Sequence, residues 1–131
     1  MSLSLYDCSI PVFIHSLSNL NDLLEAAAQY GAEHGIEDEV LTGARLFPNM
    51  LPLTKQVQIA CDIAKRGSAR MAGIEPQTDE DTETTFDQLK ARIDKTKQFL
   101  ASIQAEAING TEDNSITMQA GPNVYTFTTR D

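Results

Sequence analysis

Residues 44–65 read ARLFPNMLPLTKQVQIACDIAK, and this stretch decides how the chain folds. Pro48 and Pro52 stand four residues apart, so no earlier helix continues through them and the chain between them is extended. Pro52 is also a favourable first residue for a new helix. Apolar residues then recur in steps of three and four, with one longer step, at Leu53, Val57, Ala60, Ala64 and Met71. The sequence therefore predicts a buried helix from Pro52 to about Ala72.

The preceding segment predicts a long amphipathic helix from Leu3 to about His34. Its apolar stripe consists of Ile10, Phe13, Ile14, Leu17, Leu20, Leu24 and Ala27 or Ala28. Pro11 lies inside this pattern and lacks a backbone N–H, so either the helix kinks there or the residues before it form a separate turn. A kink is the expectation that we favour. The helix is expected to end at Gly35, and residues 36–41 predict a short connecting helix.

A third long helix is predicted to open at residues 84–87, TTFD, which have the form of a capping box with Asp87 in the acidic place. Its apolar stripe consists of Phe86, Leu89, Ile93, Thr96, Leu100 and Ile103, and the helical region ends at Asn109 and Gly110. Threonine, aromatic and β-branched residues then flank the turn at 120–123, AGPN, which predicts a small β-hairpin.

The segment between the second and third helices, residues 75–83, has five carboxylates and no base. Calcium loops need a defined alternation of ligands and a central glycine, and both are missing from this segment. We therefore expect a solvated connection.

The 131 residues fit a single domain, 1–131, and carry a formal net charge of −9. This charge opposes binding to nucleic acid or to anionic lipid. The N-terminus has no cationic segment before an apolar one, and no apolar segment is long enough to span a bilayer, so we expect a cytoplasmic protein.

Cys8 and Cys61 are not spaced from one another as the cysteines of a metal site or of a redox dithiol are. Both are expected to be small buried hydrophobes.

Three helices and a hairpin leave part of the apolar surface uncovered. We expect this surface to be covered by a partner subunit, or by a fourth helix that residues 1–131 do not contain.

The sequence resembles a family of uncharacterised bacterial domains placed beside the DinB and YfiT-like proposed metalloenzymes, which are four-helix bundles. The segment from Arg45 to Asp62 is the most specific part. The residues that carry the resemblance are Leu3 and Tyr6, Pro11-Val12-Phe13, Ala44-Arg45-Leu46, Pro48-Asn49-Met50, Pro52-Leu53, Gln56-Val57-Gln58, Ala60-Cys61-Asp62, Ala72-Gly73, Thr85-Phe86, Leu89 and Arg92-Ile93.

The resemblance implies a mainly α fold, a DinB-like up-and-down bundle of three long helices with a C-terminal hairpin, in which the family's final helix is lacking. This chain departs from the family at Asn49, where an acidic residue is usual. In the wider superfamily three histidines hold a divalent metal, one from the second helix and two from the last. The second helix here has no histidine, so no metal ligand carries over and no cofactor is assigned, although a divalent metal stays open.

A polar pocket is considered at His15, Arg45, Asn49 and Gln56. His15 and Gln56 could meet between the first two helices, although a partly buried imidazole bonded to a neighbour is the plainer interpretation. Arg45 is expected to cap or to pair with a carboxylate such as Asp62, and Asn49 to bond its own backbone. His15 and His34 lie roughly 28 Å apart along one helix, so one chain cannot bring both to one ion.

Three functions stay open. The first is a catalytically incomplete or non-enzymatic domain that forms a homodimer through its uncovered face. The second is a DinB-like metal-dependent transferase or hydrolase on a small molecule, with its site completed by residues outside this sequence. The third is a small-molecule binding module, so the sequence leaves open whether the protein is an enzyme.

Overall fold

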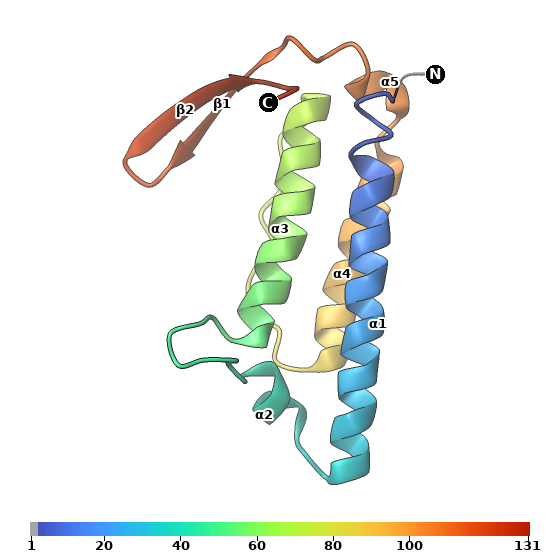
Figure 1. Cartoon of the computed structure of the whole chain (residues 1–131), viewed down its shortest axis with the longest axis vertical. Helices are drawn as coiled ribbons and strands as arrows, with labels where there is room; N and C mark the ends of the chain where they lie inside the picture. The colour runs from blue at the N-terminus through green and yellow to red at the C-terminus, as the bar shows by residue number, and fades with distance from the viewer. Residues whose placement is uncertain (1–2) are drawn as a thin grey trace.

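The computed structural model describes residues 3–131 and is mostly helical, with a small C-terminal hairpin (Figure 1). Met1 and Ser2, which begin the segment expected to lack a targeting signal, lie outside the described residues. The elements are α1 (Ile10–His34), α2 (Asp38–Thr42), α3 (Leu53–Ala72), α4 (Phe86–Ser102), α5 (Ala105–Ile108), β1 (Ser115–Ala120) and β2 (Asn123–Thr128). Over residues 3–131, no helix combines the length and the apolar character needed to cross a bilayer.

The first helix begins at Ile10, later than predicted. Pro11 lies in its first turn, where the missing N–H costs nothing because that donor would have no partner within the helix. The residues before it form a separate turn, in which the Ser9 N–H donates to the Tyr6 carbonyl at 3.0 Å. The favoured kink at Pro11 is therefore wrong, and Cys8 in this turn is exposed rather than buried.

The N-cap of α4 lies one residue later than predicted. The Thr85 side chain accepts from the Gln88 N–H, and the Gln88 side chain accepts from the Thr85 N–H, both at 3.2 Å. Thr84 and Asp87 therefore do not form the box. This frame buries Phe86 in the core, and the Phe86 N–H donates to Asp38 on α2. The helix ends at Ser102, and α5 is a separate short helix before Asn109.

The bundle is not strictly up-and-down. Figure 1 shows α1 running one way, whereas α3 and α4 both run the other way, joined by a segment that passes back along α3. Residues 73–85 can reach about 40 Å when extended, which exceeds the roughly 30 Å length of a twenty-residue helix. The connection is therefore long enough to place α4 parallel to α3.

The core lies where α1, α3 and α4 meet. The predicted stripes supply most of it, with Ile10, Leu17 and Leu24 from α1, Val57 and Ala64 from α3, and Phe86, Leu89, Ile93 and Leu100 from α4. Cys61 on α3 lies outside the predicted stripe and is buried, as expected of a small hydrophobe. The predicted hairpin is confirmed, because β1 pairs antiparallel with β2 and Gly121 turns with a φ of 61°. The hairpin lies beside the C-terminal end of α3 (Figure 1).

Candidate functional site: an open groove and an acidic strap

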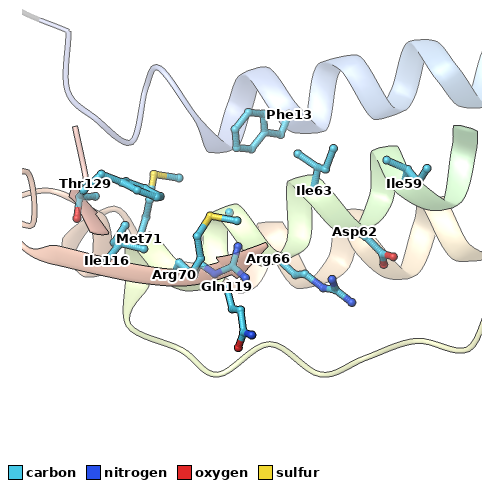
Figure 2. A pocket seen from close by; sticks show the side chains of 13 residues that line it. Phe13, Ile59, Asp62, Ile63, Arg66, Arg70, Met71, Ile116, Gln119 and Thr129 are labelled. Carbon is cyan, nitrogen blue, oxygen red and sulfur yellow. The ribbon is translucent and has the colours of Figure 1, made fainter. Parts of the chain in front are cut away.

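A groove of about 590 Å³ lies between α1, α3 and the hairpin. Its apolar lining comes from Phe13 on α1, from Ile59, Ile63 and Met71 on α3, and from Ile116, Met118 and Phe127 on the hairpin. In Figure 2, Phe13 on α1 and Ile63 on α3 point into the space between the two helices. Ile63 is 68% exposed and Ile59 is 40% exposed, so α3 presents large apolar side chains that nothing in residues 3–131 covers.

Charged side chains form the other edge of the groove. Asp62, Arg66 and Arg70 recur every four residues of α3, which places them along one side of the helix. Asp62 pairs with Arg92 on α4. None of the ion pairs within residues 3–131 includes Arg66 or Arg70. Arg66 and Arg70 therefore place positive charge at the edge of an apolar groove in a chain of net charge −9.

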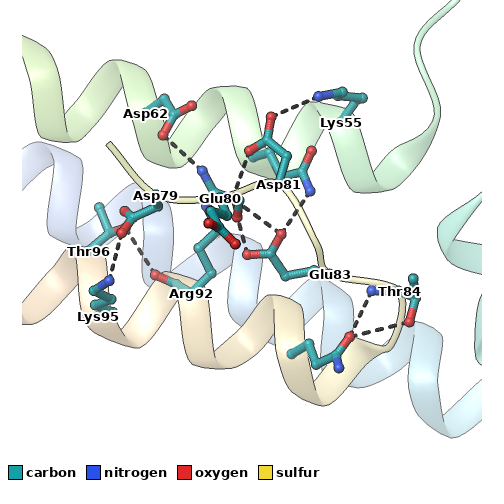
Figure 3. A network of polar contacts seen from close by, with 12 residues as sticks. Lys55, Asp62, Asp79, Glu80, Asp81, Glu83, Thr84, Arg92, Lys95 and Thr96 are labelled. Carbon is teal, nitrogen blue, oxygen red and sulfur yellow. Dashed lines mark hydrogen bonds and ion pairs between the residues drawn. The ribbon is translucent and has the colours of Figure 1, made fainter. Parts of the chain in front are cut away.

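On the other side of α3, residues 75–83 form a strap across α3 and α4 (Figure 3). Arg92, with its side chain 3% exposed, donates to Asp81 at 2.9 Å, to Glu83 at 3.1 Å and to Asp62 at 2.9 Å. Hydrogen bonds to three carboxylates compensate for the burial of this cation. The predicted solvated connection is therefore wrong for Asp79 and Glu83, whose side chains are largely withdrawn from solvent, whereas Asp81 stays exposed.

Asp79 joins the strap to both helices. It accepts from Lys65 on α3 at 2.9 Å and from Lys95 on α4 at 2.6 Å. Lys55 on α3 similarly donates to Asp81 at 2.8 Å. The basic residues on the two helices that flank the acidic segment could have suggested such ion pairs from the sequence. Which base meets which carboxylate depends on how the helices pack.

The ion pairs shift the pKa of several groups. The bond from Lys95 and then that from Lys65 hold the pKa of Asp79 below its ordinary value against the effect of desolvation. The bonds from Lys55 and Arg92 lower the pKa of Asp81 in the same way. Desolvation would lower the pKa of Arg92, but the bonds to its carboxylates outweigh it and raise this pKa. Asp79, Asp81 and Arg92 are therefore charged near neutral pH.

The four predicted pocket residues all lie outside the lining of the groove. His15 is exposed, 3.4 Å from Asn19, and Gln56 donates to the Leu51 carbonyl at 2.8 Å. Arg45 donates to the Met50 carbonyl at 3.2 Å, so it does not pair with Asp62. Asn49 is exposed in the same loop. His15, Arg45 and Gln56 therefore each have a local hydrogen-bond partner. That the four residues bind a shared ligand stays a prediction.

The residues present do not fit the three-histidine metal site of the wider superfamily. His15 and His34 are both exposed on α1, where His34 bonds the Tyr30 carbonyl. In the described part of the chain, no group of three or more His, Cys, Asp or Glu residues is placed to hold a metal ion.

The chain belongs to the DUF1993 family, a domain family of unknown function, which it matches over residues 5–131. Among solved structures, it is similar to the crystal structure of a DinB family member from Shewanella denitrificans, with a TM-score of 0.81 and 29% identity. The match covers 93% of this chain and 70% of the other. No curated protein matches. These findings confirm the resemblance to an uncharacterised DinB-like domain family.

Proposed function

We propose that this domain is a self-associating helical module that covers its open α1 and α3 face with a second copy and has no complete catalytic site of its own. The observation that supports this proposal is the exposure of large apolar side chains along one face. Ile63 is 68% exposed and Ile59 40%, and both side chains line the groove. Contiguous apolar surface of this kind on a soluble domain is typical of an interaction site.

The magnitudes are compatible with a dimer. Full burial of a large apolar side chain is worth roughly 1.5–3 kcal/mol, and a two-fold interface counts each side chain twice. Phe13, Ile59, Ile63 and Met71 are already partly buried, so only their exposed part counts, and from both copies together they reach the lower part of the roughly 4–15 kcal/mol that association costs.

The test is the oligomeric mass in solution by sedimentation velocity. Ile63→Asp should raise the dissociation constant of the dimer at least tenfold, because it places a charge at the centre of the interface. Leu23→Asp is the matched control, since Leu23 is 67% exposed on α1 and does not line the groove. A wild-type protein that stays monomeric at millimolar concentration, or equal effects of the two substitutions, would contradict the proposal.

The groove itself favours a second candidate, the binding of a small molecule. Its volume of about 590 Å³ is that of a ligand pocket, and its apolar lining with two arginines suits an amphiphile with an anionic head. Dodecanoate should then raise the melting temperature of the wild type, and Arg66→Gln with Arg70→Gln should abolish the rise. An unchanged melting temperature at saturating dodecanoate would count against this candidate.

A further inference from the structure

We infer that Asn109 is a site of spontaneous modification, where the side-chain amide reacts with the backbone nitrogen of Gly110 and is converted to aspartate and isoaspartate. The pair directly follows α5 and lies beside the turn that precedes α1 (Figure 1). Neither residue lines the groove, so the modification is independent of the proposed function. Asparagine amides are chemically labile, and the local structure decides which of them react.

The nucleophile of this reaction, the Gly110 nitrogen, is free and accessible. Asn109 and Gly110 are both exposed. The N–H groups on either side are bonded, that of Asn109 to the Ala105 carbonyl at 2.8 Å and that of Thr111 to the Ile108 carbonyl at 3.1 Å. In the described part of the chain, the Gly110 N–H has no acceptor. A Cβ on Gly110 would meet no atom within 4 Å, so no neighbouring side chain shields the nitrogen.

The electrophile, the side-chain carbonyl of Asn109, is held by a residue from the other end of the chain. The Tyr6 N–H donates to Asn109 Oδ1 at 3.1 Å. A donor at this oxygen stabilises the negative charge that develops on it when a nucleophile attacks Cγ. Asn109 Nδ2 makes no hydrogen bond within the part of the chain that the structure describes, so ammonia can leave into the solvent.

The reaction balances with water alone. The Gly110 nitrogen loses its proton to solvent and bonds to Asn109 Cγ, while the bond from Cγ to Nδ2 breaks and ammonia leaves with a proton from water. The backbone of Asn109, with ψ at 132°, must first rotate about its Cα–C bond, and the missing Cβ of Gly110 eases this rotation. One water then opens the succinimide. Cleavage at Cγ gives aspartate, and cleavage at the main-chain carbonyl gives isoaspartate.

The two products differ in their effect on the fold. Aspartate keeps an oxygen where Oδ1 was, so it still accepts from the Tyr6 N–H. Isoaspartate routes the backbone through the former side chain and removes that oxygen from its place. The turn before α1 then loses its hydrogen bond to the end of α5, although Leu5 and Tyr6 still pack against the core.

The test is ageing of the full chain at pH 8 in oxygen-18 water, followed by tryptic digestion and mass spectrometry with fragmentation. Each turn of the reaction places one oxygen-18 atom in the product. We expect labelled aspartate and isoaspartate at residue 109 to form roughly tenfold or more faster than at Asn114, because its nucleophile can approach Cγ freely. Asn114 is the control, since it is also exposed but precedes Ser115, which has a Cβ and is paired in β1.

Asn109→Gln keeps an amide but would need a larger ring, so it should stay unlabelled at this position. Equal rates at Asn109 and Asn114, or no label at Asn109, would overturn the assignment. The structural consequence is measured by hydrogen exchange of the Tyr6 amide, which should lose protection in the isolated isoaspartate form and keep it in Asn109→Asp. Unchanged protection in the isoaspartate form would contradict the loss of the contact.

Discussion

Arg92 on α4 donates to Asp62 on α3 across 2.9 Å, although thirty residues of chain separate them. This contact links the two sides of the structure, because Asp62 also lines the groove while Arg92 holds the strap through Asp81 and Glu83. The ion pair therefore holds the two parallel helices in one register and positions the charged edge of the groove.

Replacing Arg92 by leucine should destabilise the fold by about 3 kcal/mol, because it removes the one cation that three carboxylates share. Urea unfolding followed by circular dichroism measures the change. Lys95→Gln is the control, since the Lys95 side chain is 68% exposed and its loss should cost less than about 1 kcal/mol. Equal losses in the two variants would show that burial of Arg92 has no special role.

Asp79→Asn should lower the stability at pH 7 by about 1–2 kcal/mol, since it removes a charged acceptor from both Lys65 and Lys95. The folded protein holds the pKa of Asp79 below its ordinary value, so this carboxylate stabilises the fold above about pH 4 and loses its effect as the pH falls further. The difference between wild type and variant should therefore shrink below about pH 4. Urea titrations from pH 2.5 to 7 measure it, and a difference independent of pH would contradict the assignment.

Thr85→Ala should cost about 1 kcal/mol, because it removes the N-cap acceptor of α4. Thr84→Ala should cost a few tenths of a kcal/mol, since the Thr84 hydroxyl does not cap the helix. Thermal and urea unfolding of both variants decide between the two frames of the capping box. A larger loss for Thr84→Ala would favour the frame predicted from the sequence.

The two thiols should differ in reactivity. Cys61 is buried, and desolvation raises the pKa of its thiol, so little thiolate forms near neutral pH. Cys8 is exposed. Ellman's reagent at pH 8 should therefore titrate about one thiol in the folded protein and two in urea. Rapid reaction of both thiols without denaturant would show that the core around Cys61 opens readily.

Much of the fold could be predicted from the sequence, because the signals are local. The apolar periodicity of α3 and α4, the two prolines before α3 and the turn at residues 120–123 each depend on neighbours a few residues apart. The N-cap of α4 was missed by one residue, because two adjacent threonines fit the same local pattern. Gln88, the third residue after Thr85, fits a capping box better than Asp87, and the donation of the Phe86 N–H to Asp38 and the burial of Phe86 hold the helix in this frame.

The candidate site depended on the tertiary structure. Arg66 and Arg70 carry a readable signal in their spacing from Asp62, but nothing local predicts that Met118 and Phe127 of the hairpin complete the groove beside them. The sequence by itself determined which segments are helices or strands and which faces are apolar. The tertiary structure decided that α4 runs parallel to α3 and that the acidic segment pairs with both, because residues 73–85 are long enough for either direction and the choice depends on contacts between distant residues, such as those of Arg92 with its three carboxylates and of the α4 side chains in the core.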